Sequence, residues 1–185
     1  MSIETRRRQR GLSLIELLVF IVVVGIAVTG VLSVFSLNAR ASVDPMIRKQ
    51  ALAIAESLLD EVLSKPYTYC DPDDANADAA TSPAGCATTP ETAIGPEAGE
   101  TRYSNLTPFD NVNDYDGFAM NPISDITNTP VAGLGLYTAT VGVQDAGGFN
   151  GLPAGETLRV TVTVAAPGNE TVTLSGYRTR HAPQY

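Results

Sequence analysis

An apolar run from Leu12 to Leu37 constrains this chain more than any other feature. The run, LSLIELLVFIVVVGIAVTGVLSVFSL, holds 26 residues and a single charged one, Glu16. About 20 apolar residues are enough to cross the hydrocarbon core of a bilayer as a helix. A helix that is apolar all round also has no polar face to present to water. The run therefore predicts a transmembrane helix over residues 12–37.

Positive charge directly before this run predicts its orientation. The leader, residues 1–11, contains Arg6, Arg7, Arg8 and Arg10, and such cationic flanks stay in the cytoplasm. We therefore expect a single-pass inner-membrane protein with a cytoplasmic N-terminus and a periplasmic remainder. Ala39-Arg40-Ala41 fits the small-x-small pattern of a signal-peptide cleavage site. However, the apolar core of a signal peptide holds only about 7–15 residues, so we expect no such cleavage.

The composition argues against nucleic-acid binding and against catalysis. The formal net charge is −8 although the leader is basic, so the rest of the chain is strongly acidic. Such a surface repels nucleic acid, and no cluster of Lys and Arg with interleaved aromatic residues follows the leader. The one histidine, His181, lies in a polar tail, without a Ser-His-Asp or Cys-His set around it in the sequence. We expect a protein that is not an enzyme.

Residues 38–65 show the pattern of an amphipathic helix. Their apolar residues recur at helical spacing with charged residues between them, and they are Ile47, Ala51, Ile54, Ala55, Leu58, Leu59, Val62 and Leu63. The helix should end before Pro66, because the residue before a proline avoids the helical conformation. Pro45 can begin this helix or lie as a kink inside a longer one. The sequence therefore predicts one long helix or two nearly continuous helices.

The remaining chain divides into a loop-rich region and a region of strands. Residues 66–133 are rich in Pro, Asp, Asn, Ala, Gly and Thr, which favours loops. Residues 134–185 contain three stretches of alternating apolar and polar side chains, at 136–144, 158–165 and 171–175, as in an antiparallel meander. The apolar stripe of the amphipathic helix can cover the apolar face of this sheet. The expected fold class is α+β.

Two cysteines, Cys70 and Cys86, lie in the loop-rich region. In an oxidising compartment such as the periplasm, an even pair at this spacing predicts a disulfide that pins the region. The alternative is two free thiols. Catalytic dithiol chemistry needs a closer CxxC spacing, which this sequence lacks.

The segment FDNVNDYDGF places oxygen-bearing side chains at alternating positions before Gly117, a pattern typical of calcium loops. The candidate ligands are Asp110, Asn113, Asp114 and Asp116. The segment is not an EF-hand loop, because Val112 occupies a ligand position and no Glu follows at the required distance. The simpler interpretation is a turn-rich loop whose Asp and Asn side chains bond their own backbone. We expect no other metal or cofactor.

Glu16 is unusual because a carboxylate inside an apolar helix is costly unless it is paired. It occupies the fifth position of the run, which is shallow enough to reach the lipid headgroups. A second interpretation is that the chain is cut after Gly11. Leu12 then carries a free α-amino group, which is cationic at neutral pH. When copies assemble side by side, the amine of one copy can pair with Glu16 of the next.

At these residues the chain resembles a known family. The pattern R-x-R-G-L-S-L-I-E-L-L-V is similar to the class III signal of type IV prepilins and of type II secretion pseudopilins. The resemblance implies that prepilin peptidase cuts after Gly11 and methylates Leu12, and that Glu16 serves filament assembly. This chain departs from the commonest form of the signal, which has phenylalanine where Leu12 stands. Helix packing between subunits would involve Leu14, Leu17, Leu18, Ile21 and Val24.

Segments farther along the chain resemble a narrower group. DPMIRKQALAIAESLLDEVLSKPY, FDNVNDYDGF and LRVTVTV with TLSGYRTRHAP are similar to D-type minor pilins of the mannose-sensitive haemagglutinin (MSHA) pilus. This implies a type IV pilin layout with a helical stalk and a sheet head. The implied partners are prepilin peptidase, other pilin subunits and the inner-membrane assembly platform, and the final location is a pilus or the cell surface.

Two alternatives stay open. One is a minor pseudopilin of type II secretion, which would carry the same N-terminal signal. The other is a membrane-anchored periplasmic enzyme or binding module whose leader is never cut. The state of the N-terminus separates the last alternative from the first two.

Overall fold

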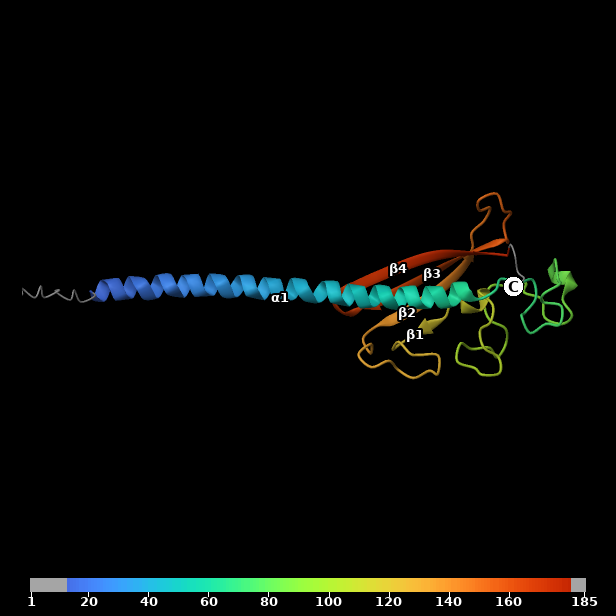
Figure 1. Ribbon diagram of the computed structural model, residues 1–185, viewed down its shortest axis with the longest axis horizontal. Coiled ribbons are helices and arrows are strands. Elements are labelled where there is room, and N and C mark those ends of the chain that lie inside the picture. Colours follow the sequence, from blue (N-terminus) through green and yellow to red (C-terminus); the bar gives the residue numbers. More distant parts are fainter. Residues whose placement is uncertain (1–12, 181–185) are drawn as a thin grey trace, which may run out of the picture. The chain divides into compact units, whose positions relative to one another are not determined.

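Figure 1 shows a computed structural model of the chain, which describes residues 13–180 and the side chains of all of these except residues 36–44. The chain divides into two units, one up to Asp44 and one from Pro45 onward. We call the second unit the head. One α-helix of the described chain, α1 (Leu14–Ser64), contributes residues to both units.

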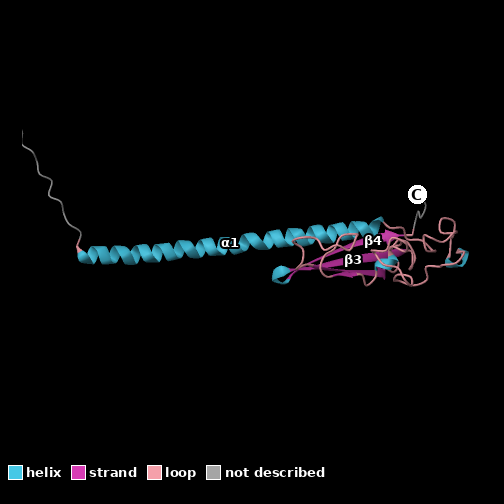
Figure 2. Cartoon of the chain, turned by 90° about the horizontal axis from the view of Figure 1, so that it is seen from below, coloured by secondary structure: helices cyan, strands magenta, loops and turns pink. Residues whose placement is uncertain are grey.

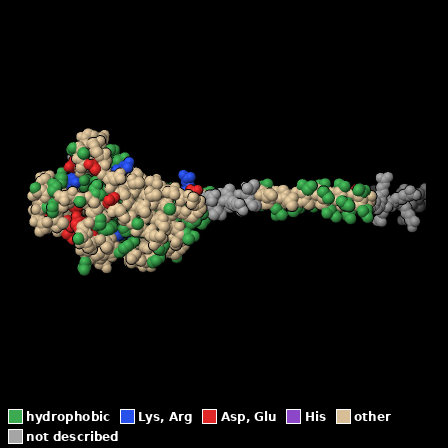
Figure 3. Space-filling view, turned by 180° about the vertical axis from the view of Figure 1, so that it is seen from behind, with side chains coloured by type: hydrophobic (Ala, Val, Ile, Leu, Met, Phe, Trp, Pro, Cys, Tyr) green, Lys and Arg blue, Asp and Glu red, His purple; other side chains and the backbone are tan. Residues whose placement is uncertain are grey.

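The first part of α1 is long and apolar enough to cross a membrane. The span Leu14–Phe35 has 22 residues and a mean hydropathy of 2.9, and all of its side chains are exposed. Figure 3 shows apolar side chains distributed along this span. Its hydroxyl groups bond within the helix, since Thr29 donates to the carbonyl oxygen of Gly25 and Ser33 to that of Thr29, each at 3.0 Å. The span therefore presents a largely apolar surface, as the sequence predicts.

Proline does not end α1. Pro45 lies inside the helix, so the structure has one helix where the sequence left one or two open. The helix ends at Ser64, two residues before Pro66, as the restriction on the residue before a proline requires. The N–H of Lys65 bonds to the carbonyl oxygen of Val62 at 3.1 Å and closes the last turn.

The head contains a four-stranded antiparallel sheet in the order β1-β2-β3-β4. The strands are β1 (Ala119–Met120), β2 (Thr138–Asp145), β3 (Thr157–Ala166) and β4 (Glu170–Thr179). The three long strands confirm the meander predicted from the alternating pattern. The sequence analysis did not find β1, because its two residues are too few to show a period of two. Pairing with β2 makes them a strand.

The head part of α1 lies along this sheet, as Figures 1 and 2 show. Its fully buried side chains are Ala51, Ala55, Leu58 and Val62. They share one hydrophobic core with the inward-facing valines of β2 and β3, which are Val141, Val143, Val160, Val162 and Val164. The predicted apolar stripe therefore covers the sheet, and the fold is α+β.

Gly176 in β4 marks a close approach of helix and sheet. A Cβ atom at this position would lie 2.5 Å from Cδ1 of Leu63 in α1, whereas carbon atoms in contact normally lie about 3.5–4.0 Å apart. The glycine pairs with Val160 of β3. Leu63 therefore fills the space that a side chain at position 176 would occupy.

A disulfide between Cys70 and Cys86 organises the loops that follow α1. The Sγ–Sγ distance is 2.05 Å, which confirms the predicted pairing. Inside the closed loop, the Asp74 carboxylate accepts hydrogen bonds from the backbone N–H groups of residues 87–89. These bonds hold the pKa of Asp74 well below its usual range. The disulfide and this carboxylate together tie the two ends of a segment that has few apolar residues.

Replacing Leu58 by alanine should destabilise the head, because the side chain is 3% exposed and its removal leaves a cavity between helix and sheet. Truncation of a buried leucine costs about 2–5 kcal/mol in the free energy of unfolding. Leu52→Ala is the matched control, since Leu52 lies on the same helix but is 37% exposed, and we expect a loss below about 1 kcal/mol.

Denaturant unfolding of the full-length protein in detergent micelles measures both variants. Near-UV circular dichroism reports on the head, because all seven tyrosines lie at residue 67 or later and the chain has no tryptophan. Equal losses of unfolding free energy in Leu58→Ala and Leu52→Ala would contradict the burial of Leu58 between helix and sheet.

Candidate functional site

Glu16 lies in the first turn of α1 with its side chain exposed. The first turn of a helix has free backbone N–H groups and the positive end of the helix dipole, and both favour a carboxylate. Its place at the end of the apolar span fits both interpretations of this residue, contact with headgroups and pairing with a neighbouring amine. Gly11 and Leu12, the predicted cleavage and methylation positions, lie outside the described residues.

The five predicted packing residues form one face of α1. Leu14, Leu17, Leu18, Ile21 and Val24 follow the spacing of a helix face, and their exposed fractions range from 40% to 80%. Other faces of the span are equally apolar, and Phe20, for example, is 63% exposed. The span can therefore contact neighbouring helices on several sides.

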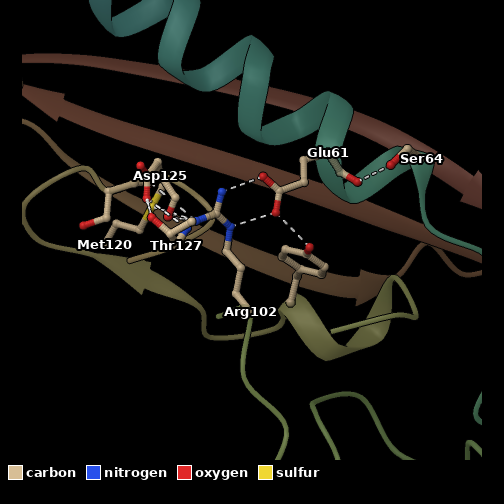
Figure 4. Close-up of polar contacts among 8 residues, drawn as sticks. Glu61, Ser64, Arg102, Met120, Asp125 and Thr127 are labelled. Carbon is tan, nitrogen blue, oxygen red and sulfur yellow. Dashed lines mark hydrogen bonds and ion pairs between the residues drawn. The ribbon is translucent and has the colours of Figure 1, made fainter. Parts of the chain in front are cut away.

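In the head, a polar network joins α1 to the loops. The guanidinium of Arg102 donates two hydrogen bonds to Glu61, both of 2.7 Å, through Nε to Oε1 and through Nη2 to Oε2. The Tyr115 hydroxyl donates to Oε1 of Glu61 at 2.9 Å. Nη1 of Arg102 also reaches the carbonyl oxygen of Asp125 at 3.2 Å. Figure 4 shows the guanidinium between the helix and the loop that carries Asp125.

The charges of this pair stabilise each other. Burial disfavours the charged carboxylate of Glu61, but the hydrogen bonds and the charge of Arg102 outweigh this effect, so the pKa of Glu61 lies below its ordinary value. The same contacts raise the pKa of Arg102 against the effect of its burial. Sequence analysis did not find this network, because 41 positions separate the two charged residues and no local pattern links them.

The four candidate calcium ligands near position 113 lie in different surroundings. Asp116 accepts the N–H of Val143 in β2 at 2.8 Å and does not appear in the acidic groups of the described chain. Oδ2 of Asp114 accepts the N–H of Asp110 at 3.0 Å, as the turn interpretation predicts. The amide of Asn113 donates to Glu91. The structure therefore brings this loop close to acidic residues from other segments.

Seven acidic side chains of the head lie close together, and we call them the acidic cluster. They are Asp71, Asp73, Glu91, Glu97, Glu100, Asp110 and Asp114, and they form three overlapping groups, each with carboxylate oxygens within 4.8 Å of one another. Burial, with added repulsion between the carboxylates, raises the pKa of Asp114 to about 7 and that of Asp110 to about 6. It also raises the pKa values of Glu91 and Glu100. These residues are the part of the described chain best suited to hold a metal ion.

Comparison with protein families recognises the N-terminal segment. Residues 6–32 match the model of the prokaryotic N-terminal methylation motif. The chain carries a prepilin-type N-terminal signal. The match contains Gly11 and Glu16 and continues into α1, so it supports a place in the type IV pilin and pseudopilin superfamily. Comparisons with curated proteins and with solved structures give no match, and the likeness to MSHA minor pilins stays a prediction.

Replacing Arg102 by leucine should destabilise the head by about 3 kcal/mol, because it leaves the Glu61 carboxylate partly buried without its cation. Arg48→Leu is the control, since Arg48 is exposed on the same helix and should change stability by less than about 0.5 kcal/mol. Denaturant unfolding in micelles at pH 7 compares the two, and equal effects would contradict a stabilising role for the pair.

The stabilisation by this pair should also depend on pH. The folded-state pKa of Glu61 lies below its ordinary value of 4.5. The contribution is therefore complete above about pH 4.5 and is lost as the pH falls through the folded pKa. The difference in unfolding free energy between the wild type and Arg102→Leu should narrow below that pH. A constant difference between pH 7 and pH 3 would contradict this assignment.

Proposed function

We propose that the protein is a structural subunit of a type IV pilus, inserted in the inner membrane with its N-terminus in the cytoplasm and then processed by prepilin peptidase. One observation supports the proposal. Residues 6–32, which contain Gly11 and Glu16, match the methylation motif, and an exposed apolar span of 22 residues begins at Leu14. A peptidase that cuts after Gly11 and methylates Leu12 would release this span with a new N-terminus.

Cleavage changes the charge at the start of α1. Before the cut, the arginines of the leader hold the N-terminus in the cytoplasm. The cut removes them and leaves one cation, the α-amino group of Leu12, and methylation of an amine keeps its charge. The processed chain thus has a cation and the Glu16 carboxylate four residues apart, which corresponds to about 6 Å along a helix.

Assembly supplies a partner for that carboxylate. An unpaired carboxylate is costly in an apolar environment, and the faces of the span around Glu16 carry only apolar neighbours such as Leu17 and Phe20. When the Leu12 amine of one subunit meets Glu16 of the next, the ion pair exists only between subunits. The pair then favours assembly and sets the axial offset of neighbouring helices, while the apolar faces supply the packing contacts.

The narrower assignment is a minor pilin of the MSHA type. It rests on the resemblance of a helix segment, residues 44–67, and of head segments at residues 109–118, 158–164 and 173–183, to D-type subunits. A type II secretion pseudopilin would share the N-terminal signal. Deletion of the gene distinguishes the two, since loss of pili supports the pilin assignment and loss of exoprotein secretion with normal pili supports the pseudopilin.

Mass spectrometry of the protein from its native membrane tests the processing step. We expect an N-terminal peptide that begins with N-methylated Leu12, and an uncut precursor in cells that lack prepilin peptidase. An intact Met1 in wild-type cells would exclude processing and favour an unprocessed membrane-anchored protein.

Substitution of Glu16 tests the assembly step. Glu16→Ala should be inserted and cut normally but reach sheared pili at least about tenfold less than the wild type, because a lost contact of about 1.4 kcal/mol corresponds to a factor of ten. Glu56→Ala is the control, since Glu56 is an exposed carboxylate on the same helix. Quantitative immunoblots of pili and membranes measure both, and normal incorporation of Glu16→Ala would refute the assembly role.

A further inference from the structure

We propose that the acidic cluster of the head is a binding site for calcium, centred on Glu91, Glu97 and Asp114. This site is independent of the N-terminal signal and of the assembly role. It differs from the set suggested by the sequence, because Glu91 and Glu97 come from another loop and Asp116 is bonded to β2.

The spacing of the three central carboxylates fits a single ion. Glu91, Glu97 and Asp114 each offer one oxygen, and these oxygens lie within 4.8 Å of one another. Calcium binds oxygen at about 2.3–2.6 Å, so two ligands of one ion lie at most about 5 Å apart. Glu91 is 8% exposed and Asp114 is 1% exposed. The site is therefore already shaped, with two of its carboxylates held out of water.

Buried oxygens without partners point to a ligand. Within the described chain, Oε1 of Glu91, Oδ1 of Asn113 and Oδ1 of Asp114 are buried and accept no hydrogen bond. A buried polar atom without a partner is costly, and more so when it carries charge. The three residues lie together, because Asn113 bonds to Glu91 and Glu91 shares an acidic group with Asp114. A cation coordinated by the three oxygens would explain all of them.

The second oxygen of each buried carboxylate is held in place. Oδ2 of Asp114 accepts the N–H of Asn111 at 2.7 Å and that of Asp110 at 3.0 Å. Oε2 of Glu91 accepts a hydrogen bond from the side-chain amide of Asn113. Each carboxylate is thus oriented through one oxygen and leaves the other oxygen available. In metal sites, a second layer of hydrogen bonds of this kind orients the ligands.

Backbone contacts bring the contributing loops together. Next to the disulfide at Cys70, the N–H of Asp71 bonds to the carbonyl oxygen of Thr89 at 3.0 Å, and the N–H of Glu91 bonds to that of Tyr69 at 2.8 Å. These two bonds flank the antiparallel bridge between Cys70 and Pro90 and hold the chain around Asp71 against the chain around Glu91. The loop then returns, and the N–H of Gly95 bonds to the carbonyl oxygen of Asn113 at 3.1 Å. Backbone hydrogen bonds next to the disulfide therefore join the loops that carry the proposed ligands.

The ligand chemistry selects the ion. The cluster offers carboxylate oxygens and, through Asn113, an amide oxygen, and both cysteines of the chain are joined in the disulfide. Zinc and copper favour nitrogen and sulfur donors, whereas carboxylate and carbonyl oxygens suit calcium, magnesium and manganese. Calcium accepts six to eight oxygens in irregular geometry, while magnesium requires a near-ideal octahedron. Loops that supply many carboxylates favour calcium.

Positive side chains near the cluster are engaged elsewhere or lie at its edge. Arg180 borders the same cavity as Glu91 and Asn113. Its guanidinium lies over the Tyr67 ring, 3.7 Å from the centroid, and Nε is 3.9 Å from Glu156. The positive charge of Lys65 partly offsets the rise in the pKa of Asp110, which lies at the side of the cluster. These two cations leave the charge of the central carboxylates for a metal ion to neutralise.

Thermal unfolding with and without calcium tests the proposal directly. The full-length protein in detergent micelles is freed of metal with EDTA, dialysed, and melted with calcium chloride or with magnesium chloride. At about 100 times the dissociation constant, calcium should raise the Tm by about 5 °C or more, and magnesium at the same concentration should raise it less. An unchanged Tm together with no calcium retained in equilibrium dialysis would overturn the proposal.

Variants separate coordination from a purely structural role. Glu97→Gln should weaken calcium binding at least tenfold in equilibrium dialysis, while its Tm in EDTA stays equal to or above that of the wild type, because it removes one charge from a crowded group. Glu56→Gln, an exposed carboxylate on α1, should keep the full calcium response. Glu97 is only half-buried, so Glu97→Gln is expected to fold even if Asp114→Asn does not. A Glu97→Gln variant that binds calcium as the wild type does would overturn the assignment of this ligand set.

Discussion

Burial of one stripe of α1 against the sheet is the contact on which the rest of the head depends. Three long strands and a two-residue edge strand offer one face of valines, and the apolar face of a sheet must be buried against another element. Ala51, Ala55, Leu58 and Val62 remove the face from solvent, and Gly176 gives Leu63 room to lie on β4. The helix is therefore an integral part of the head and not a linker to it.

The loops between α1 and β2 depend on that helix through polar contacts. Apolar side chains of these loops, such as Phe109, Val112 and Tyr115, join the same core as the helix and the sheet, and polar contacts add to this burial. Arg102 inserts between the helix and the loops and binds Glu61 through two short hydrogen bonds. The disulfide and the Asp74 carboxylate close the segment that follows. Covalent and charged contacts thus supplement the hydrophobic core in these loops.

The two proposals share a physical logic. At the start of α1, Glu16 is a carboxylate among apolar side chains, and we propose that its partner is the Leu12 amine of a neighbouring subunit. In the head, Glu91 and Asp114 have buried oxygens that no group in the described chain satisfies. In each case the missing partner comes from outside the chain, as the amine of a neighbouring subunit or as a calcium ion. Assembly and metal binding would then act on different units of the protein.

The sequence was sufficient to predict the apolar span, the helix stripe and the three long strands, because each depends on residues that are near one another in the chain. The span is a continuous apolar run, the stripe repeats at helical spacing, and the strands alternate apolar and polar side chains. The Gly11–Glu16 signal was equally readable, since its residues are adjacent in the chain. Sequence analysis did not find the two-residue β1, the Glu61–Arg102 pair or the acidic cluster. They join residues tens of positions apart in segments without a repeating pattern, and only the paths of the loops, closed by the disulfide, bring those side chains together.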